Sequence, residues 1–187
     1  SYVTDDYFAF LADSEVYTSN SKSKMCISVG RIPCSTSEQL DGYIQNKLKP
    51  HMENKNYGKW KNRIILMADD NEASTAYQRF CEYSDNLAKK VKTYNNSMEV
   101  KKVYFDAYTR TTGANGSRYH EVENLIKEEL ANGVMFFNYV GHSSNTGFSA
   151  EHVFTQTQAA TMFNKNCGFW YTASCEFSQF DNLKQSG

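Results

Sequence analysis

The stretch FFNYVGHSSNTG, residues 136–147, decides the fold class, because an apolar strand and an abrupt change to polar residues meet within it. The run that ends at Val140 has the length and composition of a strand buried on both faces. His142 follows two residues later. A histidine in this position suggests chemistry only if a reactive partner ends a neighbouring strand.

Apolar strands alternate with amphipathic helices on both sides of this stretch. The pattern predicts strands over residues 24–33, 62–70, 99–108, 136–140 and 168–175, and helices over residues 35–48, 74–91, 122–130 and 156–163. A capping box of Ser35 and Glu38 begins the first helix, Gly133 ends the third, and residues 109–117 form a loop. This alternation predicts an α/β fold, a parallel sheet with helices on both faces.

Length and composition favour a single globular domain. The 187 residues are 40% hydrophobic and carry a net charge of -1 without a basic stripe, which argues against nucleic-acid binding. No apolar run is long enough to span a membrane, and no signal-peptide pattern opens the sequence. The abrupt ends of the sequence predict that residues 1–187 are a single domain excised from a longer chain.

The five cysteines do not by themselves fix the redox compartment. Cys26 and Cys34 lie eight residues apart along one expected strand and the residue that follows it, and Cys167 and Cys175 lie eight residues apart along another strand and the residue that precedes it. Eight extended residues span about 26 Å, whereas a disulfide needs Cα atoms within about 7 Å. Neither pair is therefore expected to bridge, and no cysteine spacing indicates zinc.

Reactive side chains end three of the expected strands: Asp69 with Asp70, His142, and Cys175. In open α/β sheets, ligands bind outside the carboxyl ends of the strands. A cysteine nucleophile needs an imidazole that stabilises its thiolate, and a carboxylate can orient that imidazole. The two aspartates leave three roles open, namely capping the next helix, orienting His142 or holding a cation, and we favour Asp69 for His142.

The remaining histidines and acids give weaker signals. His51 and His120 lie at helix edges in polar surroundings, which is typical of solvated side chains, and His152 follows the glycine loop. Asp5 and Asp6 are the residue type that binds calcium, but two adjacent carboxylates do not locate a site. We therefore expect no cofactor and no catalytic metal.

Several segments together resemble the gingipain family of cysteine peptidases, which have a caspase-like fold. They are NYVGHSS (138–144), YTASCEFSQFD (171–181), ISVGRIP (27–33), ILMADD (65–70) and YFDAY (104–108), in the family's order. The step of 33 residues from His142 to Cys175 also fits. The Cys175 segment is more similar to the sortase-like peptidases of the type IX secretion system than to the secreted gingipains.

The resemblance implies roles for particular residues. Cys175 would be the nucleophile, His142 the general acid/base and Asp69 the acid near the histidine. The backbone N–H groups of Cys175 and Ser143 would form the oxyanion hole.

Two residues depart from the family pattern. Ser143 stands where the family has glycine, and Phe148 stands where it tends to have tryptophan. If position 143 needs a positive φ, a serine there costs energy. Loss of one oxyanion donor typically costs about 100- to 1,000-fold in rate.

The resemblance also implies partners and a location. The substrates would be exported proteins with C-terminal secretion signals, the acyl acceptor a lipopolysaccharide amine or water, and the neighbours other outer-membrane secretion components. The expected location is the cell surface or outer membrane of a Gram-negative bacterium. Three functions remain open: a sortase-type endopeptidase, a gingipain-like protease that only hydrolyses, and a catalytically impaired homologue that binds cargo.

Overall fold

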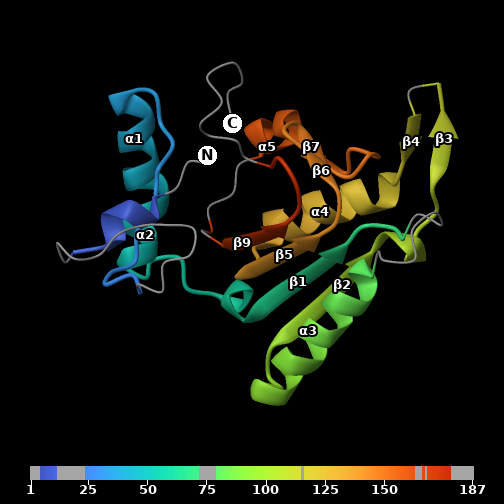
Figure 1. The fold of residues 1–187 in the computed structure, drawn as a ribbon, viewed down its shortest axis with the longest axis horizontal. Coiled ribbons are helices and arrows are strands. Elements are labelled where there is room, and N and C mark those ends of the chain that lie inside the picture. Colours follow the sequence, from blue (N-terminus) through green and yellow to red (C-terminus); the bar gives the residue numbers. More distant parts are fainter. Residues whose placement is uncertain are drawn as a thin grey trace.

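A four-stranded parallel sheet organises the chain (Figure 1). The structure is a computed structural model, and it describes residues 5–11, 24–71, 79–114, 116–162, 166 and 168–177. In the order β2-β1-β5-β9, the sheet comprises β2 (Glu99–Tyr104), β1 (Arg63–Ala68), β5 (Phe136–Val140) and β9 (Phe169–Ala173). All three strand pairings are parallel, which confirms the α/β class predicted from the alternating pattern.

Helix α3 (Phe80–Tyr94) covers one face of the sheet (Figure 1). Because side chains alternate along a strand, Ile64 and Leu66 of β1 point to this face, where they pack with Ala88 of α3. The helix was expected over residues 74–91, of which 74–78 lie outside the described residues. The buried residues of this smaller core are Ile64, Leu66, Ala88 and Met98.

Helix α4 (His120–Asn132) covers the opposite face. Ile65 and Met67 of β1 point toward it and pack in one cluster with Ile126. The helix ends at Gly133, whose φ of 87° lies in the left-handed region that favours glycine, so the predicted C-cap is confirmed. The sheet thus has helices on both faces, as the sequence predicted.

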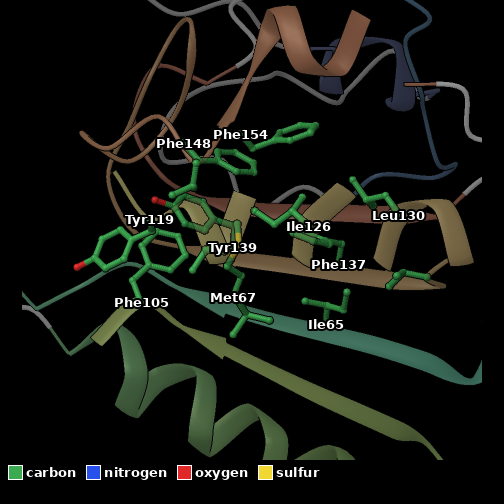
Figure 2. Close-up of a cluster of buried hydrophobic side chains, with 14 residues drawn as sticks. Ile65, Met67, Phe105, Tyr119, Ile126, Leu130, Phe137, Tyr139, Phe148 and Phe154 are labelled. Atoms are coloured by element: carbon green, nitrogen blue, oxygen red, sulfur yellow. The ribbon is translucent and has the colours of Figure 1, made fainter. Parts of the chain in front are cut away.

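An aromatic layer extends this second core beyond the helix (Figure 2). Tyr139 of β5 stacks on Phe148, with ring centroids 4.2 Å apart, and Phe154 lies on the far side of Phe148. These two phenylalanines come from a small antiparallel sheet that follows β5 directly. Its strands are β6 (Ser143–Ser144), β7 (Gly147–Phe148) and β8 (Phe154–Thr155).

The segments around the sheet match the expected helices, with local differences. Helix α5 (Gln156–Thr161) begins with a capping box of Thr155 and Gln158. The segment expected as a loop, residues 109–117, instead forms most of a hairpin of β3 (Thr111–Gly113) and β4 (Gly116–Arg118). Short 3-10 turns are η1 (Asp6–Ala9), η3 (Lys59–Asn62) and η4 (Phe105–Ala107).

The helix expected over residues 35–48 lies to one side of the sheet (Figure 1). It consists of α1 (Ser37–Tyr43), a π-helical segment η2 (Ile44–Leu48) and α2 (Lys49–Met52). The predicted capping box of Ser35 and Glu38 is wrong by one residue. Thr36 is the N-cap, and its hydroxyl accepts a hydrogen bond from the backbone N–H of Gln39.

The strand predicted over residues 24–33 is also wrong. This segment forms no strand and is exposed, and its Cys26 N–H donates to the carbonyl of Ala9. An alternating pattern stabilises a strand only when a partner strand supplies backbone hydrogen bonds, and no strand in the described part of the chain pairs with it. The extended-chain argument against a Cys26–Cys34 bridge therefore loses its premise, but its conclusion is confirmed, because both thiols are free.

Strand β9 has one covered face and one open face. Trp170 stacks on Phe137 in the aromatic core, with centroids 4.3 Å apart. Phe169 and Tyr171 point the other way and are 62% and 53% exposed, because α3 does not extend over this strand. None of the described helices is both long and apolar enough to cross a membrane.

Phe148 tests the aromatic core. Its side chain is fully buried against Tyr139, so Phe148→Ala removes a ring that neighbouring side chains cannot replace. We expect the free energy of unfolding to fall by about 3–5 kcal/mol, measured by urea denaturation. Tyr94→Ala, at a side chain that is 89% exposed, is the control and should change it by less than about 0.5 kcal/mol. An equal effect of the two substitutions would contradict this view of the core.

Candidate functional site

The carboxyl ends of three adjacent strands place the predicted site residues along one edge of the sheet. Asp69 follows β1, His142 follows β5 and Cys175 follows β9. Val140 and Ala173 are paired in the register of β5 and β9, so His142 and Cys175 each lie two residues beyond paired positions. Both residues are exposed, which leaves them open to a large substrate.

Hydrogen bonds connect the three strand ends. The N–H of Gly141 donates to the carbonyl of Ala173 over 3.3 Å, and the N–H of Asp69 donates to the carbonyl of Val140 over 3.0 Å. The hydroxyl of Ser143 donates to the carbonyl of Cys175. The structure therefore brings together the segments of all three predicted residues.

Asp69 is the buried centre of this edge, with a side chain only 2% exposed. Its Oδ2 accepts a hydrogen bond from the backbone N–H of His142 over 2.8 Å, and its Oδ1 accepts one from the N–H of Asp70 over 3.1 Å. The sequence predicted a carboxylate that orients His142. The contact described here is with the main chain of His142, and a contact with its imidazole stays a prediction.

Burial raises the pKa of Asp69 to about 6, because the ionised form loses its hydration. The hydrogen bond from the His142 N–H opposes this effect, and the negative charge of Asp70 adds to it. The carboxyl therefore changes its charge within the pH range in which many enzymes work.

Tyr139 completes the network around Asp69. Its buried hydroxyl lies 2.5 Å from the carbonyl of His142, to which it donates, and 3.1 Å from Oδ2 of Asp69. Burial raises the pKa of Tyr139, so the phenol stays neutral. Gly141 leaves room for this packing, since a Cβ there would lie 2.4 Å from the Cβ of Asp69 and 2.6 Å from the Tyr139 hydroxyl.

The imidazole of His142 packs against the aromatic ring of Phe80. Phe80, the first residue of α3, meets it edge to face, with ring centroids 5.4 Å apart. The main chain of His142 is thus held from β1 and its ring is contacted from α3. The sequence pattern does not indicate that Phe80 belongs to the site, because Phe80 and His142 lie far apart in the chain.

A second group of buried acids lies behind Asp69. Asp70 accepts a hydrogen bond from the Tyr119 hydroxyl over 2.7 Å, and Arg110 forms an ion pair with Glu151 over 3.0 Å. Ligand atoms of Asp69, Asp70 and Glu151 lie within 4.8 Å of one another. Because Arg110 supplies a positive charge to Glu151 and Asp70, these carboxylates already have a counter-ion.

The other candidates lie elsewhere. Asp5, considered for calcium, accepts hydrogen bonds from the guanidinium of Arg31. His51, His120 and His152 are exposed, as expected of solvated side chains.

Of the other cysteines, Cys81 bears on the choice of nucleophile. Burial raises the pKa of Cys81 to about 11, and the nearby carboxylate of Asp106 adds to this, so this thiol is a poor nucleophile. Cys167 lies outside the described residues.

The backbone of Ser143 differs from what the sequence suggested. Its φ lies outside the left-handed region, whereas Ser149, His152 and Glu176 have φ values of 57°, 53° and 53°. The backbone cost considered for a serine after His142 therefore does not arise. Glu176, directly after Cys175, is one of the residues that do adopt a left-handed φ.

Comparisons with known proteins agree with this architecture. The parallel sheet has helices on both faces and carries a histidine and a cysteine beyond the ends of adjacent strands, which makes the chain an α/β protein. The sequence model of peptidase family C25 matches residues 1–187, and this chain belongs to that family. No match was found among curated protein sequences.

One solved structure similar to this chain is that of "the Arg specific cysteine proteinase gingipain R". The TM-score is 0.58 at 19% sequence identity, over 80% of this chain and 32% of that one. A likeness at this identity establishes the fold. This chain thus spans about a third of the length of the gingipain structure that it matches.

Asp69 provides a test through pH. Its folded-state pKa of about 6 lies above the ordinary value of 3.8, so the folded state holds the proton more tightly than the unfolded state. The resulting stabilisation is complete below pH 3.8 and is lost as the pH rises to about 6. We expect wild type to lose up to about 3 kcal/mol of unfolding free energy across this window relative to Asp69→Asn.

Urea denaturation of both proteins at steps between pH 4 and 7 measures this difference. Asp41→Asn, which removes an exposed carboxylate on α1, is the control and should follow wild type. Parallel curves for wild type and Asp69→Asn would show that Asp69 has no raised pKa.

Proposed function

We propose that this chain carries the catalytic site of a cysteine endopeptidase, with Cys175 as nucleophile and His142 as general acid/base. The observation that carries the proposal is the register of β5 and β9, which sets these two exposed residues at matching positions on one sheet edge. Membership of peptidase family C25 supports it.

The proposed reaction forms and breaks one bond at a time. The Cys175 thiolate attacks the carbonyl carbon of the scissile peptide and forms a C–S bond. His142 gives a proton to the leaving nitrogen as the C–N bond breaks, which leaves a thioester on Cys175. Water or an amine then attacks the thioester carbon and gives a proton to His142, and the C–S bond breaks, which releases the acyl product and regenerates the Cys175 thiolate.

The backbone N–H groups of Cys175 and Ser143 are the proposed donors to the oxyanion. The ordinary φ of Ser143 supports this role, because the position imposes no left-handed strain on the serine. Asp69 is proposed as a positioning residue that holds the main chain of His142 through the 2.8 Å hydrogen bond.

A narrower proposal concerns the substrate. The resemblance of the Cys175 segment to sortase-like peptidases supports cleavage before C-terminal secretion signals, followed by transfer of the acyl group to an amine, with a lipopolysaccharide as the acceptor. A site of this kind would work at the outer membrane together with other secretion components. Hydrolysis alone is the alternative. A purely cargo-binding role has lost its main support, since the strain considered at Ser143 is not present.

Thiol reactivity tests the catalytic pair. An ordinary thiol loses most of its reactivity below about pH 8.5, because its thiolate fraction falls tenfold with each pH unit. We expect Cys175 to be alkylated by iodoacetamide at pH 6 at least about ten times faster than exposed Cys34, and His142→Ala to abolish this difference. The rates are measured for each cysteine by peptide mass spectrometry.

The exposed thiol of Cys34 serves as an internal standard in every sample. If Cys175 and Cys34 respond equally to pH in folded protein, the chain contains no thiolate–imidazole pair, and the proposal fails.

Product analysis tests the reaction itself. With a peptide library as substrate, we expect Cys175→Ala to lower kcat/KM by at least about 1,000-fold and His142→Ala by about 100- to 10,000-fold. When hydroxylamine or a primary amine is added, acyl transfer should yield the hydroxamate or the amide of the acyl fragment, which mass spectrometry detects. Products with hydrolytic masses alone, at any amine concentration, would exclude transfer and leave a hydrolase. Retained cleavage by Cys175→Ala would exclude this site.

A further inference from the structure

We propose that the side chain of Ser143 is a positioning element that fixes the main chain of Cys175. Its hydroxyl donates a hydrogen bond to the Cys175 carbonyl and so joins the segment after β5 to the segment after β9. The inference rests on the proposed catalytic role of Cys175. Glycine, which the resemblance gives as the family's residue after the histidine, cannot form this contact.

The donor side of this contact is rigid. Ser143 belongs to β6 and pairs with Phe148 of β7. On its N-terminal side, the N–H of His142 bonds to Asp69, and the carbonyl of His142 accepts a hydrogen bond from the N–H of Ser149 over 2.9 Å. The serine hydroxyl therefore projects from a backbone that is held on both sides.

The acceptor side has few other supports. The neighbouring hydroxyl of Ser174 is buried without a hydrogen-bond partner among the described residues, so it does not anchor the segment. Phe177 packs on Phe148 with ring centroids 4.6 Å apart. Among the described residues, the Ser143 hydroxyl and the Phe177 ring both connect residues 174–177, the cysteine segment, to the β6–β7 hairpin.

The backbone geometry at Glu176 indicates how the hydrogen bond from the Ser143 hydroxyl fixes the cysteine segment. Glu176 has a φ of 53°, a conformation that costs a non-glycine residue about 1 kcal/mol or more. The peptide between Cys175 and Glu176 is trans, so its C=O and N–H point in opposite directions. A hydrogen bond to the carbonyl fixes the whole peptide plane, and with it the strained turn that presents Cys175.

Ser143 therefore has two roles in the proposed site. Its main-chain N–H is a proposed oxyanion donor, and its side chain holds the nucleophile's own peptide unit. Ser143 thus connects the cysteine segment to the histidine segment. Removal of a single hydrogen bond of this kind typically changes an equilibrium by about three- to tenfold.

The experiment compares Ser143→Ala with Ser143→Thr, which keeps the hydroxyl. Ser144→Ala is the matched control, because the Ser144 hydroxyl contacts Thr146 over 2.9 Å instead. The readouts are Cys175 alkylation at pH 6, kcat and KM on a cleaved peptide, and amide hydrogen exchange in a peptide covering residues 169–177.

For Ser143→Ala we expect Cys175 alkylation and kcat to fall about three- to tenfold, with little change in KM. Hydrogen exchange in residues 169–177 should become faster, while the urea unfolding midpoint stays near that of wild type. Ser143→Thr should recover most of the loss, and Ser144→Ala should match wild type. Unchanged exchange in Ser143→Ala, or an equal effect of Ser144→Ala, would overturn the inference.

The alkylation and hydrogen-exchange results distinguish a failure of the positioning role of Ser143 from a failure of the proposed catalytic function. If wild-type Cys175 reacts like Cys34 but Ser143→Ala still speeds exchange in residues 169–177, the attachment stands and the catalytic proposal fails. If wild-type Cys175 is activated and Ser143→Ala changes neither exchange nor alkylation, the catalytic proposal stands and the positioning role of Ser143 fails.

Discussion

The hydrogen bond from the His142 main chain to the buried Asp69 carboxylate is the constraint on which the sheet edge depends. It joins the ends of β1 and β5 and accounts for the residues around it. Gly141 must be small because any Cβ would meet Asp69, and Tyr139 fits beneath because its hydroxyl reaches the His142 carbonyl. A buried carboxylate is costly unless hydrogen bonds satisfy it. Two backbone N–H groups do so here, so the acid and the loop geometry require each other.

In this arrangement, the residues that hold the sheet edge in place differ from the residues proposed to react. The residues that hold the edge in place, Asp69 and Tyr139, are buried, whereas His142 and Cys175 are exposed. A parallel sheet provides this separation, because its interior is apolar and only the strand ends reach solvent. The aromatic layer adds to the support, since Phe148 packs both on Tyr139 and on Phe177 of the cysteine segment (Figure 2 shows Phe148 and Tyr139).

The sequence predicts the parts of this structure that depend on local patterns. The apolar runs before Asp69 and His142 identified β1 and β5, and the change to polar residues located both site segments. The pattern around Ile27 predicts a strand that does not form, because strand pairing depends on a partner strand that the pattern itself does not contain. The contacts of Tyr139 and of the Ser143 hydroxyl were missed for a related reason. Each joins residues through space, although a buried tyrosine among apolar strand residues does signal a need for a hydrogen-bond partner.

The open face of β9 has a consequence for the behaviour of the chain in solution. Phe169 and Tyr171 lie on the last strand of the described sheet, beside backbone groups that no further described strand pairs with. An edge strand with two largely exposed aromatic rings is a template for strand addition between molecules. Copies of this chain at high concentration are therefore expected to associate through β9, and the thiol of Cys175 lies directly beyond the end of that strand.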